Sequence, residues 1–194
     1  MGLYQTSITL RGKLLSPLLY VLTKAGISPS AVSYAGLFFI LFFIPALSRP
    51  WLAVLVLGAA LLMDLIDGPL ARFQGNASHA GKFVDMMMDT LVFAIFMTGL
   101  AYYTYLNAIL ALLFLFFVNL SRLLRTLYKV KTSKIPFAKL SGFLILPTWC
   151  IALSYLGFLL AVFGFNVLSP FAAVFSLLLL LDSANFFSKL KQAL

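Results

Sequence analysis

The chain has 194 residues, of which 63% are hydrophobic and only 10% are charged, and its mean hydropathy is +1.07. Soluble domains have about 45–50% apolar and about 25% charged residues, so this composition excludes an ordinary soluble protein and indicates an integral membrane protein. The formal net charge is +9. Because the basic residues lie between apolar runs, membrane topology explains this charge better than nucleic-acid binding does. A single cysteine, Cys150, excludes a disulfide framework.

The first 25 residues combine leucines at helical spacing with basic and small polar residues on the other side. This pattern predicts an amphipathic helix that lies in the membrane interface. Gly26 is suited to end that helix, and Ser28 or Ser30 can cap the next one, with Pro29 in its first turn.

Six apolar segments follow, each of about the length that crosses roughly 30 Å of hydrocarbon at about 1.5 Å per residue. We predict an all-α membrane protein with six transmembrane helices preceded by the interfacial helix, in a single domain over residues 1–194. The predicted spans are Ser30–Leu47, Trp51–Arg72, Gly81–Tyr103, Asn107–Tyr128, Leu140–Phe163 and Pro170–Phe187.

The distribution of basic residues predicts the orientation in the membrane. Six spans place both termini on one side, and thirteen of the fourteen Lys and Arg residues then share that side, with only Arg49 opposite. Since Lys and Arg concentrate in cytoplasmic loops, we expect a multi-pass protein whose termini and 74–80 loop are cytoplasmic.

Carboxylates are concentrated in one stretch. The chain has five acidic residues, and four of them lie between positions 64 and 89. Asp64 and Asp67 end the second predicted span, and Asp85 and Asp89 begin the third. Each pair lies about one helical turn apart, and the short loop between the spans makes them antiparallel neighbours, so we expect the two pairs to face each other.

Four carboxylates at low dielectric repel one another, so they take up protons or recruit cations. A site made only of oxygen ligands selects hard divalent ions, Mg²⁺ or Mn²⁺. Two such ions can hold a diphosphate, while one carboxylate is left to act as a base. Gly68, Gly81 and Ala71 leave room for a bulky ligand, and Arg72 can pair with phosphate oxygens. The residues therefore predict metal-assisted cleavage of a phosphoanhydride at the cytoplasmic face.

Intramembrane carboxylates have a second interpretation. They also line cation pathways, so a divalent-cation transporter is the alternative of another class. A purely structural cluster is disfavoured, because burying charges without partners costs several kcal/mol each.

The stretch also resembles a known family signature. Asp64-x2-Asp67-Gly68-x2-Ala71-Arg72-x8-Gly81-x3-Asp85-x3-Asp89 is similar at every fixed position to the signature of the CDP-alcohol phosphotransferases. The resemblance extends to the plan of six spans with an interfacial N-terminal helix. It implies homodimers that displace CMP from a CDP-linked donor by attack of an alcohol.

The resemblance also implies roles for the signature residues. Asp64, Asp67 and Asp85 would bind a pair of Mg²⁺ or Mn²⁺ ions, and Asp89 would complete that site and act as the catalytic base on the acceptor hydroxyl. The expected CDP-binding residues are Asp64, Gly68, Ala71, Arg72, Gly81 and Asp85.

The chain's size is similar to that of phosphatidyltransferases, which use a CDP-lipid, such as CDP-diacylglycerol or CDP-archaeol, and a small polar alcohol. The alternative branch uses CDP-choline or CDP-ethanolamine with a lipid acceptor. Pro29-Ser30-x2-Ser33-x2-Gly36 resembles the Pro-Asn-x2-Thr-x2-Gly segment of the family's first span, with serines in place of Asn and Thr.

Arg122 and Arg125 lie on one helical face near the cytoplasmic end of the fourth span. One hypothesis is that they bind the phosphate of a phosphorylated acceptor, since Arg matches phosphate geometry. Positive-inside topology and attraction to anionic lipid explain the same residues, so both interpretations stay open. Asp182, the fifth acidic residue, either lines the acceptor pocket or forms an ion pair with a lysine such as Lys189, and of the two we expect the ion pair.

Overall fold

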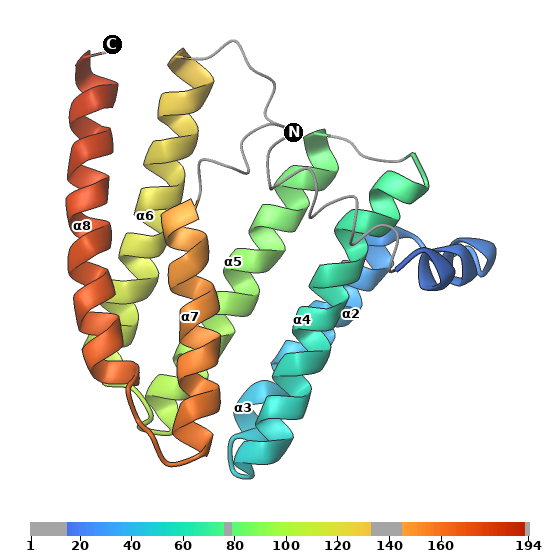
Figure 1. The fold of residues 1–194 in the computed structure, drawn as a ribbon, viewed down its shortest axis with the longest axis horizontal. Coiled ribbons are helices and arrows are strands. Elements are labelled where there is room, and N and C mark those ends of the chain that lie inside the picture. Colours follow the sequence, from blue (N-terminus) through green and yellow to red (C-terminus); the bar gives the residue numbers. More distant parts are fainter. Residues whose placement is uncertain (1–14, 76–78, 133–144, 193–194) are drawn as a thin grey trace. The chain divides into compact units, whose positions relative to one another are not determined.

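The computed structural model describes residues 15–75, 79–132 and 145–192, which form helices joined by short connections, with no strand in these ranges (Figure 1). The chain divides into two compact units, Met1–Val92 and Phe93–Leu194. The helices after the N-terminal one are α2 (Pro29–Leu41), α3 (Phe43–Ala46), α4 (Pro50–Phe73), α5 (His79–Tyr102), α6 (Ala108–Thr132), α7 (Ile145–Val162) and α8 (Leu168–Gln192).

The described part of the N-terminal helix, Leu15–Lys24, meets α2 at a bend of 106°. Gly26 produces the bend with a φ of +72°, and the Ile27 N–H donates to the Leu22 carbonyl over 3.0 Å. Ser28 then caps α2 by accepting a hydrogen bond from the Ala31 N–H, and Pro29 follows in the first turn. The break and the cap that the sequence predicted are therefore confirmed.

The first predicted span is interrupted near its end. Helix α2 stops at Leu41, and the short helix α3 begins at Phe43. Pro45 accounts for the interruption, because it has no N–H to donate to the Leu41 carbonyl and its ring crowds that carbonyl. The predicted span Ser30–Leu47 is therefore two helices in the structure.

In the first unit, α2 packs antiparallel against α4 (Figure 1). Gly36 permits a close approach, because a Cβ there would lie 3.1 Å from Met63 Cβ and 3.3 Å from the Ala60 carbonyl oxygen. Closer to the bend, Leu19 of the N-terminal helix joins Val32 and Leu70 in a buried apolar cluster. The N-terminal helix, α2 and α4 thus share one small core.

In the second unit, α6 and α8 run parallel and α7 runs antiparallel to them (Figure 1). Ring contacts among Phe93, Phe96, Phe114, Tyr155 and Phe158 link α5, α6 and α7. The Asn166 side chain donates to the Tyr105 carbonyl and ties the loops that precede α6 and α8. These contacts join the helices of the second unit and hold the starts of α6 and α8 near each other.

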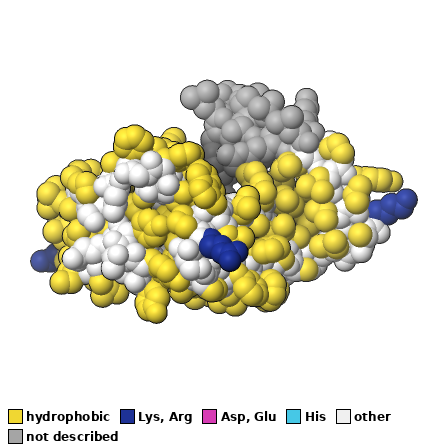
Figure 2. All heavy atoms as spheres, turned by 90° about the horizontal axis from the view of Figure 1, so that it is seen from below, with side chains coloured by type: hydrophobic (Ala, Val, Ile, Leu, Met, Phe, Trp, Pro, Cys, Tyr) yellow, Lys and Arg dark blue, Asp and Glu magenta, His cyan; other side chains and the backbone are white. Residues whose placement is uncertain are grey.

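The exterior is apolar, as in a membrane protein. Leu55, Leu112 and Leu181 are among many large exposed apolar side chains, which a soluble monomer rarely exposes together. Figure 2 shows hydrophobic side chains over most of one face. Within the described residues, α4, α8 and the part of α6 at Ala108–Tyr128 are long and apolar enough to cross a membrane, and the bent pair of N-terminal helix and α2 could be a fourth span.

Two further predicted spans correspond to α5 and α7, which contain the shorter apolar helical segments Met86–Tyr102 and Leu146–Val162. Residues 140–144 of the fifth predicted span lie outside the described residues. The count of six spans and the interfacial position of the N-terminal helix therefore stay predictions.

Candidate functional site

The first half of the carboxylate stretch lies in the last turns of α4. Asp64 and Asp67 are one turn apart, and Gly68, Ala71 and Arg72 follow on the same helix. Helix α4 continues through Pro69, which cannot donate to the Leu65 carbonyl. All five signature residues of this half are thus presented on one helix end.

Asp67 is the buried member of the first pair, with 6% of its surface exposed, whereas Asp64 is exposed. The Ser33 hydroxyl lies 2.5 Å from Asp67 Oδ2 and 3.2 Å from the Pro29 carbonyl oxygen. A hydroxyl has one proton to donate, and a charged acceptor at the shorter distance forms the stronger bond. Ser33 of α2 therefore donates to Asp67 of α4.

Arg72 lies next to the glycine of the signature. A Cβ at position 68 would be 3.7 Å from Arg72 Nη1, so the guanidinium lies over the surface that Gly68 leaves bare. Asp64 and Arg72 are both charged neighbours of Asp67. This end of α4 thus combines two carboxylates and one guanidinium within a few turns.

The C-terminal end of α4 is held against the bend before α2. The Gln74 side-chain amide donates to the Ile27 carbonyl over 2.9 Å and lies 3.4 Å from Thr23 Oγ1. Gly75 follows with a φ of +69° and ends the helix. The helix turn that carries Arg72 is therefore tied to the N-terminal helix.

The second half of the signature lies on α5, which carries Gly81, Asp85 and Asp89. Asp89 is half-buried, and the side chain of Asp85 lies outside the described residues. Within the described residues, no three His, Cys, Asp or Glu side chains form a group that could hold a metal ion. The prediction that the two pairs of carboxylates face each other therefore stays a prediction.

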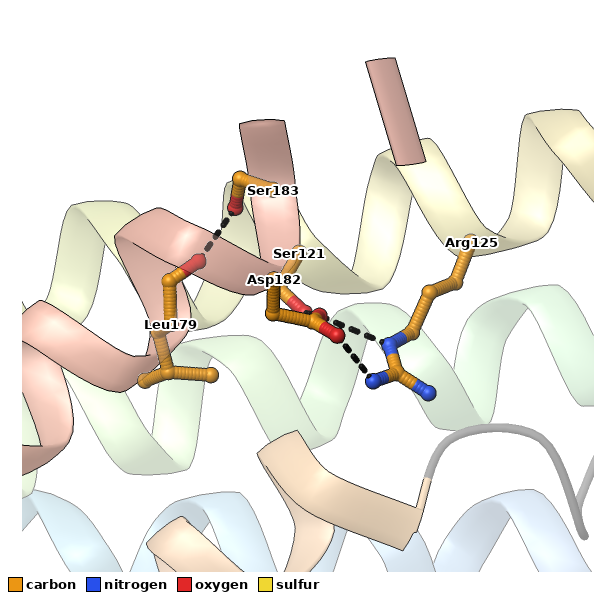
Figure 3. Close-up of polar contacts among 5 residues, drawn as sticks. All are labelled: Ser121, Arg125, Leu179, Asp182 and Ser183. Carbon is orange, nitrogen blue, oxygen red and sulfur yellow. Dashed lines mark hydrogen bonds and ion pairs between the residues drawn. The ribbon is translucent and has the colours of Figure 1, made fainter. Parts of the chain in front are cut away.

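Arg125 of α6 and Asp182 of α8 form an ion pair in the second unit (Figure 3). Arg125 Nη2 contacts Asp182 Oδ1, Arg125 Nε donates to Oδ2 over 2.9 Å, and the Ser121 hydroxyl donates to Oδ2 over 2.5 Å. The expected lysine partner of Asp182 is wrong. Arg125 lies on the facing helix and bridges both oxygens, whereas the Lys189 ammonium lies over the Phe186 ring.

Two polar contacts between helices were not predicted from the sequence, Ser33 with Asp67 and Arg125 with Asp182. In the sequence, Ser33 differed from the family segment by replacing Thr, which gave it no role. Its position one turn before Gly36 could have indicated that both residues lie on the face of α2 that packs on α4. The Arg125–Asp182 pair depends on the parallel register of α6 and α8, and no local pattern in the sequence encodes that register.

The helices and the α4 site define a class. An all-helical chain with several apolar membrane-crossing helices and a carboxylate-rich helix end is an integral membrane protein with an ionic site. The family model for CDP-alcohol phosphatidyltransferase matches residues 26–181. The chain therefore belongs to the CDP-alcohol phosphatidyltransferase family, as the signature predicted. No curated protein matches the chain at a significant level.

Membership places the chain among transferases of phosphate-containing groups that act in phospholipid biosynthesis with a CDP-alcohol donor and an alcohol acceptor. The match begins at the Gly26 bend and covers most of both compact units.

Proposed function

We propose that the protein transfers a phosphatidyl-type group from a CDP-lipid, such as CDP-diacylglycerol or CDP-archaeol, to a small polar alcohol and releases CMP. The observation that supports this most is the end of α4, where the buried Asp67 and the exposed Asp64 precede Gly68 and the Arg72 guanidinium lies over its bare surface. Carboxylates beside a guanidinium suit a ligand that carries both cations and phosphates.

The oxygen ligands that these residues supply fit a divalent metal ion. Asp64 and Asp67 supply only oxygen, and Asp85 and Asp89 of α5 would complete a site for two Mg²⁺ or Mn²⁺ ions. When bound, such ions supply Lewis-acid stabilisation of the diphosphate charge.

The protein side chains have separate tasks in this proposal. Arg72 binds a phosphate oxygen, and Gly68, Ala71 and Gly81 admit the CDP moiety. Asp89 accepts the proton of the acceptor hydroxyl as its oxygen attacks the phosphorus that bears the lipid alcohol. The bond from that phosphorus to the CMP oxygen breaks, and CMP leaves with the electron pair.

We further propose that the site faces the cytoplasm, where nucleotide and acceptor arrive from water while the lipid chains enter from the bilayer. The enzyme would act as a homodimer.

The substrate assay uses purified protein with Mg²⁺ or Mn²⁺ and scores CMP release from CDP-diacylglycerol against a panel of polar alcohols, some of them phosphorylated. A parallel arm supplies CDP-choline or CDP-ethanolamine with diacylglycerol. We expect turnover in the first arm only. Turnover only in the second arm would assign the aminoalcohol branch, and no turnover together with divalent-ion flux in liposomes would assign a transporter.

The acceptor hypothesis for Arg122 and Arg125 has its own test. If these residues bind an acceptor phosphate, Arg122→Gln and Arg125→Gln should each raise the acceptor KM by about 10-fold or more and leave the donor KM nearly unchanged, since a charged hydrogen bond is worth about 1.5–3 kcal/mol. Arg125 also forms an ion pair with Asp182, so Arg125→Gln removes that ion pair as well. Asp182→Asn removes the ion pair but keeps the guanidinium, so it separates acceptor binding by Arg125 from its structural role. Equal changes in both KM values would contradict the hypothesis.

A further inference from the structure

Ser33 is joined to the signature by a contact that the signature itself does not contain. It lies on α2, 34 positions before Asp67, and its hydroxyl is 2.5 Å from Asp67 Oδ2. Asp67 is also the buried carboxylate of the pair on α4. A short hydrogen bond to a buried carboxylate restricts the rotation of that carboxylate.

The packing on both sides of the Ser33–Asp67 pair holds it in place. One turn beyond Ser33, Gly36 brings α2 close to Met63 and Ala60 of α4. On the other side, the buried Val32 and Leu70 belong to the cluster with Leu19. The serine is therefore held close to α4, and its short side chain reaches Asp67 across the contact between the two helices.

The chemistry of the contact suits a residue that orients a metal ligand. A serine hydroxyl is neutral, so it fixes the carboxylate without cancelling its negative charge. An ionised carboxylate has about four lone-pair sites, so one hydrogen bond leaves the others for a cation. Asp182 differs, because Arg125 compensates its charge and contacts both of its oxygens.

We infer that Ser33 is a positioning residue, which holds Asp67 of α4 in the orientation that binds the divalent cation. This inference rests on the proposed function, because it takes Asp67 to be a metal ligand. Ser33 thereby acts on a metal ligand through a contact from α2 to α4. Asp67 has a hydrogen-bond partner outside α4 and α5, the two helices that carry the signature.

The test is a Mn²⁺ titration of the purified full-length protein without substrate, in which electron paramagnetic resonance reports the free ion. Hydrogen bonds to a metal ligand typically alter metal affinity by about 10- to 100-fold, so Ser33→Ala should raise the Kd for Mn²⁺ by that factor. Ser33→Thr keeps the hydroxyl and should restore affinity to within about three-fold of the wild type.

Ser121→Ala is the matched control. It removes a serine–carboxylate hydrogen bond of the same 2.5 Å length, to Asp182 in the other compact unit. We expect its Kd for Mn²⁺ to equal that of the wild type. If Ser33→Ala lowers the yield of folded protein, Ser33→Thr and Ser33→Cys still compare a strong donor with a weak one on side chains that fill the site.

Two outcomes overturn the inference and can be told apart. If the wild type binds Mn²⁺ and Ser33→Ala binds it as tightly, Ser33 does not position the ligand and the proposed function stands. If the wild type binds no Mn²⁺ and releases no CMP, the proposed function fails and the inference fails with it.

Discussion

Two serine–carboxylate pairs show how single residues make acidic side chains tolerable in an apolar chain. Asp182 is compensated by a guanidinium that contacts both of its oxygens, and only 11% of its side chain is exposed. Asp67 receives a neutral hydroxyl and lies beside Asp64 and Arg72 at a helix end. The guanidinium neutralises the charge of Asp182, which suits a structural ion pair. The serine hydroxyl orients the carboxylate of Asp67 and leaves its charge, which suits a metal ligand.

The Arg125–Asp182 pair should be important for stability. Asp182→Asn should lower the free energy of unfolding by about 3–5 kcal/mol, because it leaves a guanidinium in an apolar setting without its anion. The double variant Arg125→Met with Asp182→Leu should lose much less, since it removes both charges. Reversible unfolding in mixed micelles measures both variants, and a single variant as stable as the wild type would contradict this account.

At the residues of the signature, the carboxylates should divide into two roles. Asp67→Asn should weaken Mn²⁺ binding by at least about 10-fold, because it removes a charged ligand. Asp89→Asn should lower kcat by about 100-fold or more, because it removes the base, while the Kd for the CDP-linked donor changes little. Donor binding by isothermal calorimetry and turnover by CMP release separate the two effects, and loss of donor affinity in Asp89→Asn would contradict the assignment.

The helical elements show which features sequence could predict. Cap and break residues act locally, so the chain alone predicted the break at Gly26, Pro29 in the first turn and a serine cap, which the structure assigns to Ser28 rather than Ser30. The interruption at Phe42 was missed, because apolar composition continues through it and only the backbone chemistry of Pro45 reveals it. The placement of Asp64, Asp67, Gly68, Ala71 and Arg72 at one helix end could be predicted because these residues lie on a single helix. The contacts of Ser33 on α2 and of Asp182 on α8 depend on how the helices are aligned against their neighbours, and the hydrophobic periodicity of the sequence does not encode that alignment.

Packing of α2 on α4 should depend on one glycine. Gly36→Ala places a methyl group 3.1 Å from Met63 Cβ, and overpacking of this kind costs about 1–3 kcal/mol. The control is Gly58→Ala on α4, where nothing lies within 4 Å of the added Cβ. Thermal unfolding in detergent should show a lower midpoint for Gly36→Ala and an unchanged or higher one for Gly58→Ala. Equal midpoints would contradict a close approach at Gly36.

For the whole molecule, the apolar exterior and family membership establish a membrane transferase, and the orientation of the chain is a prediction from its basic residues. In a Cys150→Ser background, single cysteines can be placed at position 48, in the turn between α3 and α4, and at position 75, after α4. We expect an impermeant maleimide to label only position 48 in intact cells and to label position 75 after permeabilisation, since the basic loops are cytoplasmic. The opposite pattern would place the site outside.

CMP release in a single turnover tests the proposed reaction and its metal site together. Enzyme in excess is mixed with a CDP-linked lipid, Mg²⁺ or Mn²⁺ and the acceptor alcohol that the panel selects. In the time that the wild type needs to release one CMP per donor, we expect almost no CMP from Asp89→Asn, and none from the wild type after the divalent cation is chelated. Equal CMP release by the wild type and Asp89→Asn, or release that persists after chelation, would contradict a carboxylate-and-metal site on α4 and α5.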